Sequence, residues 1–171
     1  MASERLQEIG NVTDRATALI RQLLIFGHRE IRQLSPHNLN AVLLDLQTML
    51  SRIIAEKITM EWDFTPDLSL VEADLGQLQQ VVMNLVINAA DAMPDGGVVH
   101  LTTTNVTVLP DDNQYDPDTY PGDYVSLAVM DTGTGISAEI VSQIFEPFFT
   151  TKGPDKGTGL GLSTIFAIVK K

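Results

Sequence analysis

The segment Asn84-Leu85-Val86-Ile87-Asn88-Ala89-Ala90-Asp91-Ala92 decides how the surrounding sequence folds. Its apolar residues have helical spacing, and a helix places Asn84, Asn88 and Asp91 on one face because they stand at i, i+4 and i+7. The opposite face is apolar and suits packing on a sheet. Three polar side chains in register are costly unless they are satisfied. They are therefore either paired inside the protein or the lining of a polar site, and the helix alone favours neither.

Helices and strands alternate on both sides of this segment. Alternating apolar and polar residues predict strands with one buried face, and caps and breakers set the ends of the helices. The expected elements are a helix capped by Asn40, strands Ile58–Phe64 and Leu68–Ala73, a helix capped by Asp74 with inner face Leu75, Leu78, Val82, Leu85 and Val86, strands at about 98–109 and 124–130, a short helix from Ser137 and a last helix at about 160–171. This order predicts an α+β fold with a mostly antiparallel sheet and helices on one face.

The first part of the chain has a different pattern. From Ser3 to about Leu34, apolar residues recur at helical spacing on one side, which predicts a long helix that ends before Pro36. A helix with such a narrow stripe needs a partner surface, in this chain or in another. We therefore expect two parts, a helical one at 1–35 and the α+β domain at 36–171.

Composition narrows the functional class. The 171 residues are 44% hydrophobic and carry a net charge of −11, which is a globular composition and argues against nucleic acid as a partner. Cysteine is absent from the sequence, so neither disulfides nor thiolate metal sites are expected. The sequence contains no apolar stretch approaching the roughly 18 residues of a membrane span. A soluble, cytoplasmic chain is the expectation, which leaves open whether a longer parent protein is membrane-anchored.

Three further segments carry chemistry. Asp131-Thr132-Gly133-Thr134-Gly135-Ile136 follows a strand expected to be buried, where a carboxylate can accept a hydrogen bond from a ligand amine, although an ordinary turn fits at least as well. Phe145–Lys152 predicts a loop pinned by its own phenylalanines, with Lys152 as a candidate phosphate contact. Gly157–Leu162 opens the last helix, whose free N–H groups favour phosphates, although a glycine-rich turn alone is weak support.

In this order the four segments resemble the N box, first glycine box, F box and second glycine box of sensor histidine kinases, members of the Bergerat-type (GHKL) ATPases. The resemblance implies a two-layer α/β sandwich that binds Mg-ATP and positions the γ-phosphate for transfer to a histidine. It thus implies the catalytic domain of a two-component protein-histidine kinase. The alternative is a non-catalytic nucleotide-binding or interaction module derived from such a kinase.

The resemblance also implies roles for single residues. Asp131 would accept the exocyclic amine of adenine, and Asn88 would ligate Mg²⁺ with Asn84 alongside it. Residues 136–158 would form a mobile lid, in which Lys152 is the candidate for touching the terminal phosphates. The other implied nucleotide contacts are Asp91, Gly133, Gly135, Ile136 and Thr151 and, in the phosphate cradle, Gly157, Thr158, Gly159, Leu160, Gly161 and Leu162.

One substitution separates kinase from hydrolase within this resemblance. Hydrolysing relatives carry a water-activating glutamate one turn before the metal-binding asparagine. Here Asn84 stands at that place, and an amide has no useful basicity. We therefore expect ATP to be held without efficient cleavage.

The phosphoacceptor and the end of the chain depart from the family pattern. His28 is followed by an acid displaced by one position, a loose imitation of a phosphoacceptor box, so this chain alone is not expected to complete autophosphorylation. Residues 1–35 resemble the second helix of a dimerisation hairpin, and the domain looks trimmed after the second glycine box, without two further strands. The implied partners are a phosphoacceptor hairpin of the same or another chain, a response regulator or receiver domain, and a second copy of this chain.

Overall fold

The computed structural model describes residues 33–54, 56–110, 118–153 and 157–170. The expected helix over residues 3–34 falls almost wholly outside the described residues, and His28 lies outside them too. The chain divides into two units, Met1–Gln33 and Leu34–Lys171, and the elements below belong to the second unit.

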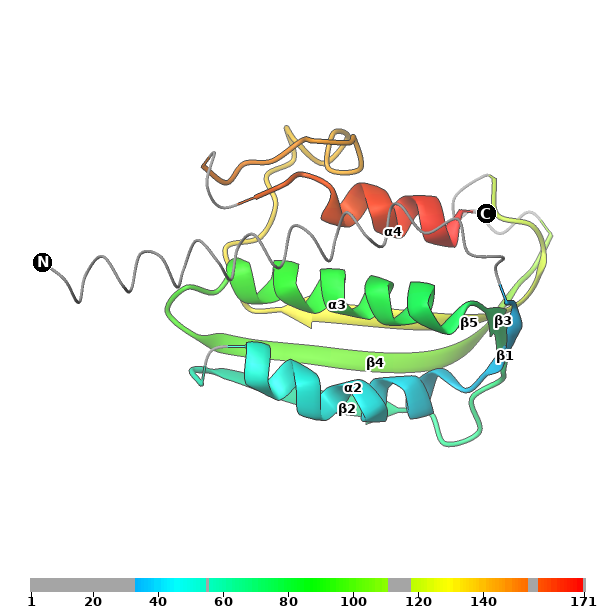
Figure 1. Ribbon diagram of the computed structural model, residues 1–171. Helices are drawn as coiled ribbons and strands as arrows, with labels where there is room; N and C mark the ends of the chain where they lie inside the picture. Colours follow the sequence, from blue (N-terminus) through cyan, green and yellow to red (C-terminus); the bar gives the residue numbers. More distant parts are fainter. Residues whose placement is uncertain (1–32, 55, 111–117, 154–156, 171) are drawn as a thin grey trace, which may run out of the picture. The chain divides into compact units, whose positions relative to one another are not determined.

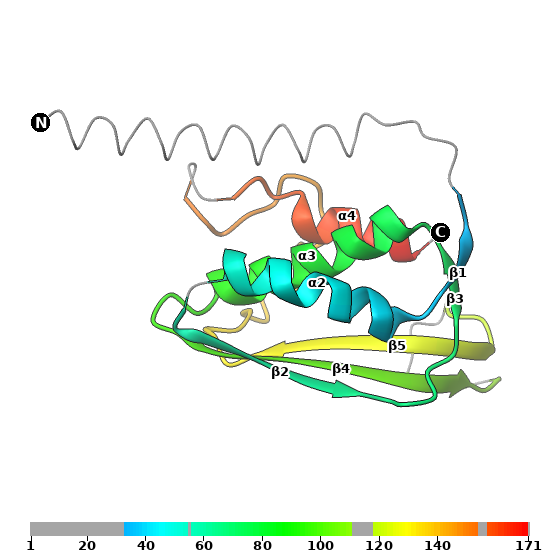
Figure 2. The same cartoon turned by 60° about the horizontal axis from the view of Figure 1, so that its bottom comes forward.

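In the described part of this unit there are two sheets and three helices. Its elements in order are β1 (Ser35–His37), α2 (Leu39–Ile53), β2 (Ile58–Phe64), β3 (Val71–Ala73), α3 (Leu75–Asp91), β4 (Gly97–Val108), β5 (Gly122–Asp131) and α4 (Gly161–Val169). Strands β2, β4 and β5 form one sheet with β4 in the centre, and β1 pairs with β3 in a second, antiparallel sheet. All three helices lie on the same side of the larger sheet (Figures 1 and 2). The expected α+β class with helices on one face is confirmed.

The pairing inside the larger sheet is mixed. β4 and β5 are antiparallel, with Val99 opposite Asp131, whereas β2 and β4 are parallel, with Ile58 opposite Gly97. The parallel pair follows from α3, because a chain that returns along a helix enters the next strand in the original direction. The larger sheet is therefore mixed, with one parallel and one antiparallel pair. With the antiparallel pair of β1 and β3 included, two of the three described strand pairs are antiparallel.

A single apolar core lies between α2, α3 and one face of the larger sheet. Burial alternates along β2 as the sequence predicts. The core side chains with less than a tenth of their surface exposed include Leu43, Leu46 and Leu50 of α2, Val82, Val86 and Ala89 of α3, and Val99 and Leu101 of β4. This core fixes one side of α3 against the sheet. The helix α4 packs against another side of α3 (Figure 1). None of the helices within the described ranges has the length and apolar character of a bilayer span.

The start of α2 differs from expectation. Asn38, not Asn40, is the N-cap, and its side chain accepts a hydrogen bond from the Ala41 N–H at 3.3 Å. Asn40 lies inside the helix, where Nδ2 donates to the Thr65 carbonyl at 2.8 Å and Oδ1 accepts from the Thr103 hydroxyl at 2.7 Å. Both asparagines fit a cap by sequence, and the distant partners of Asn40 decide between them. Asp74 caps α3 as predicted, accepting from the Gln77 N–H at 3.0 Å.

Three other local expectations are wrong. Leu75 does not belong to the inner face of α3 but is 42% exposed, since it lies in the first turn, before the helix reaches the core. The strand expected from Leu68 begins only at Val71, where pairing with His37 starts. No helix begins at Ser137; instead isolated i→i−3 hydrogen bonds at Ile140, Gln143 and Glu146 form successive turns. Without consecutive i→i−4 bonds, such turns do not propagate into an α-helix.

Candidate functional site

The polar face of α3 meets the beginning of α4. The Asn84 side chain donates a hydrogen bond from Nδ2 to the Gly161 carbonyl at 3.3 Å, across 77 positions of sequence. A methyl group on Gly161 would come within 3.3 Å of Nδ2 of Asn88, so this glycine lies directly beside the second asparagine. Both asparagines are half-buried. Two of the four sequence segments are therefore side by side, and the predicted shared face of Asn84 and Asn88 is confirmed.

The first turn of α4 presents backbone donors at this place. Its N-cap, Leu160, makes no side-chain capping hydrogen bond. The N–H groups at the start of an α-helix have no partner within the helix, and the helix dipole is positive there. Gly161, Leu162 and Ser163 thus offer main-chain donors next to Asn88.

The turn after β5 is tied to the end of α3. The Thr134 N–H donates to the Ala92 carbonyl at 3.1 Å. A side chain at Gly133 would bring its Cβ to 2.6 Å from that same carbonyl oxygen, so only glycine fits. Asp131 closes the turn by accepting from the Gly133 N–H at 2.9 Å, and its carboxylate is exposed. The turn geometry considered from the sequence is present, and the Asp131 carboxylate at the end of β5 is accessible. The expectation of a buried strand before this turn is wrong, because the residues of β5 are exposed or half-buried.

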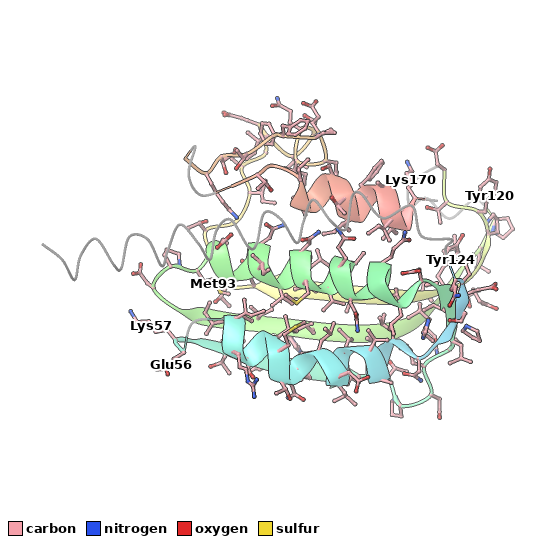
Figure 3. The ribbon with its side chains drawn as sticks, in the orientation of Figure 1. Glu56, Lys57, Met93, Tyr120, Tyr124 and Lys170 are labelled. Carbon is pink, nitrogen blue, oxygen red and sulfur yellow. The ribbon has the colours of Figure 1, made fainter. Side chains whose placement is uncertain are left out.

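Thr132 holds this turn in place. Its N–H donates to the Val98 carbonyl at 3.2 Å, and its hydroxyl accepts from the Val98 N–H at 3.1 Å. The hydroxyl also lies 3.5 Å from the sulfur of Met93, which is 3% exposed. Figure 3 shows Met93 at the end of the unit that carries Glu56 and Lys57, away from Tyr120 and Tyr124. Sequence reasoning missed these positioning residues, because the only local signal was a threonine beside Asp131.

The loop after the turn is closed by backbone contacts. The Phe148 N–H donates to the Gly159 carbonyl at 2.9 Å, and Phe148 has a φ of 69°. Gly159 has a φ of 66°, and a Cβ there would collide with the Phe148 main chain. Phe148 itself is 74% exposed, whereas the Phe145 ring lies 5.3 Å from that of Phe166 in α4. The expectation of a loop pinned by its own phenylalanines therefore holds for Phe145, which packs on α4, but not for Phe148, whose backbone rather than its ring holds the loop.

Lys152 reaches the end of α3. Its Nζ donates to Oδ2 of Asp91 at 2.5 Å. Its stem lies against the glycine segment, since a Cβ on Gly157 would be 3.2 Å from the Lys152 Cβ and 2.5 Å from the Thr150 hydroxyl oxygen. The structure thus brings the four sequence segments together along the C-terminal half of α3.

The remaining predicted positions differ in exposure. Ile136, Thr151 and Asp91 are exposed, whereas Thr158, Leu160 and Leu162 are half-buried around the start of α4. Gly135, with a φ of 70°, has open space where a side chain would stand. Among the described residues, no three His, Asp or Glu side chains form a group that could hold a metal ion alone.

Comparisons with known proteins agree with this arrangement. Residues 73–171 match the family described as histidine kinase-, DNA gyrase B-, and HSP90-like ATPase. Sensor kinase CckA of Brucella abortus (strain 2308) is 44% identical over 166 residues, which cover 97% of this chain and 18% of CckA.

Solved structures extend the comparison. The catalytic domain of histidine kinase ThkA superposes with a TM-score of 0.60 at 29% identity, covering 81% of this chain and 82% of that one. Full-length ShkA in complex with AMPPNP gives a TM-score of 0.67 at 26% identity, covering 92% of this chain and 31% of that one. This chain belongs to the histidine kinase-, DNA gyrase B-, and HSP90-like ATPase family, within which it carries the ATP-binding catalytic domain of the sensor histidine kinases.

Proposed function

We propose that the chain binds Mg-ATP between α3, the turn after β5 and the start of α4, and presents the γ-phosphate to a histidine supplied by another element. The observation that carries this proposal is the contact of Asn84 and Asn88 with Gly161. This contact brings amide side chains of α3 next to the free main-chain donors at the start of α4. These are the groups that bind a polyphosphate and its cation without covalent chemistry.

Asp131 selects the base in this proposal. Its carboxylate is exposed and is held by Gly133, while Thr132 anchors the turn to β4. A carboxylate accepts a hydrogen bond from the exocyclic amine of adenine, whereas guanine presents a carbonyl oxygen at that position and is repelled. Gly133 and Gly135 let the backbone approach the ring closely, since neither carries a side chain.

Asn88 fits a Mg²⁺ site of mixed ligands. Its amide oxygen is a hard donor of the kind Mg²⁺ takes, and the ion usually completes its shell with phosphate oxygens and water. The half-buried Asn88 side chain lies beside Gly161, in the first turn of α4. Magnesium, when bound with the nucleotide, supplies neutralising charge for the phosphates. Asn84 holds α4 in register, and Lys152 adds a cationic donor for the terminal phosphates.

Transfer rather than hydrolysis follows from the residue types. Asn84 cannot accept a proton from water, and Asp91, the nearby carboxylate, is paired with Lys152. The domain therefore holds ATP until an imidazole nucleophile arrives. We infer that its partners are the phosphoacceptor hairpin of the same or another kinase chain and a response regulator or receiver domain, with a second copy of this chain as a further partner.

The test combines binding and transfer. Calorimetry with Mg-AMPPNP should show binding that Asp131→Asn and Asn88→Ala each weaken by about tenfold or more, equivalent to ~1.4 kcal/mol. Asp95→Asn is the matched control, because Asp95 is an exposed carboxylate in the turn after α3 and makes none of the site contacts described above. Incubation with labelled ATP and a separate phosphoacceptor hairpin should then yield phosphohistidine. Equal binding by all variants contradicts the proposed site, and brisk phosphate release contradicts transfer.

A further inference from the structure

The ion pair of Lys152 and Asp91 joins two distant parts of the chain. It links the loop after β5 to the last residue of α3 across 61 positions, with Nζ and Oδ2 2.5 Å apart. The side chains are 33% and 46% exposed, so the pair is partly shielded and still open to solvent ions. A contact of this kind holds the loop weakly and can be replaced.

Both partners stand at the proposed phosphate position. Asp91 follows Asn88 by three residues on α3, and residues at this spacing are neighbours on a helix surface. The Lys152 stem lies against Gly157, where the glycine segment begins. The carboxylate of Asp91 and a terminal phosphate would therefore face the same ammonium group.

We propose that Asp91 and the terminal phosphate of ATP compete for Lys152, which makes Asp91 a determinant of the preference between ATP and ADP. This inference rests on the proposed function of the site. Asp91 opposes the terminal phosphate in two ways: it repels a group of like charge, and it occupies the cation that this group needs. ADP lacks the terminal phosphate and is affected less. Without nucleotide, the pair latches residues 145–153 onto α3.

Two measurements on the full chain test this proposal, with Asp91→Asn and Lys152→Met as variants and Asp95→Asn as control. Asp91→Asn should bind Mg-AMPPNP about three- to fivefold more tightly, the range expected for one exposed ion pair, and Mg-ADP within about twofold of wild type. Lys152→Met should bind Mg-AMPPNP more weakly than the wild type does. Both variants should raise hydrogen exchange at the amides of Thr151, Lys152 and Gly153 without nucleotide, because either change breaks the latch. Asp95→Asn should alter neither measurement.

Each other outcome has a definite meaning. Weaker Mg-AMPPNP binding by Asp91→Asn makes Asp91 a positioning or cation-binding residue and overturns competition. Tighter binding with unchanged loop exchange shows repulsion alone and overturns the latch. If Asp91→Asn does not fold, Lys152→Met still decides the latch through loop exchange, and Asp91→Ala takes the place of Asp91→Asn in the binding measurement. Wild type that binds neither nucleotide overturns the proposed function itself, whereas wild-type binding that Asp91→Asn leaves unchanged overturns only this inference.

Discussion

The side-chain amide of Asn84 donates a hydrogen bond to the carbonyl oxygen of Gly161, 3.3 Å away and 77 residues further along the chain. This bond ties the middle of α3 to the first turn of α4. It therefore sets where the main-chain donors of α4 stand relative to Asn88, and the proposed phosphate site depends on it.

Replacing Asn84 tests that dependence. Asn84→Ala removes one partly buried hydrogen bond and should lower the free energy of unfolding by about 1 kcal/mol, measured by urea denaturation. Affinity for Mg-AMPPNP should fall in parallel, because α4 loses its tie to α3. Gln80→Ala is the control, since Gln80 is half-buried one turn earlier on α3 and makes no side-chain hydrogen bond with the described residues. Equal losses of stability and of affinity in both variants would show that the hydrogen bond of Asn84 contributes to neither.

Two glycines with similar backbone angles should respond differently to alanine. Gly159, at a φ of 66°, is packed against the Phe148 main chain, whereas Gly135, at a φ of 70°, has open space around it. Gly135→Ala should cost only the conformational penalty of about 1–2 kcal/mol. Gly159→Ala adds a collision with backbone and should also release the loop, which limited proteolysis would detect as faster cleavage. Similar cleavage of the two variants would contradict this packing.

Thr132 should act through position rather than through contact with nucleotide. Thr132→Val removes the acceptor of the Val98 N–H and should cost about 0.5–1.5 kcal/mol of stability, seen as a lower Tm. Thr132→Ser keeps the hydroxyl and should restore most of this loss. The ratio of ATP to GTP affinity should fall in the valine variant alone, since a displaced Asp131 no longer discriminates the base. A ratio that is the same in both variants contradicts the positioning role.

The two asparagines at the start of α2 give a test of the fold itself. Asn38→Ala removes a cap and should destabilise the protein by about 1 kcal/mol. Asn40→Ala should cost more, about 1–3 kcal/mol, because it leaves the Thr65 carbonyl and the Thr103 hydroxyl without their partner. Thermal unfolding of the two variants side by side measures the difference, and a larger loss for Asn38→Ala would reverse the assignment of the cap.

Elements with local signals can be predicted from the order of the amino acids alone. Alternation marks β2, the Asp74 cap and the spacing of Asn84 and Asn88 mark α3, and the four motifs identify the family. Each of these patterns is formed by residues that lie close together in the sequence, so the sequence is enough to recognise it. The roles of the single site residues stay predictions, since they concern a ligand rather than the fold.

Contacts between distant segments follow from the packing of the whole domain. The parallel pairing of β2 with β4 arises from the path of α3, and Asn40 is inside a helix because Thr65 and Thr103 come to it. Lys152 pairs with Asp91 across 61 residues, and the Phe148 N–H pairs with the Gly159 carbonyl. No local pattern encodes these contacts, because each depends on how complete elements pack. The physical reason is that hydrogen bonds and charges are satisfied by whichever partner the packed core brings near, not by the nearest one in sequence.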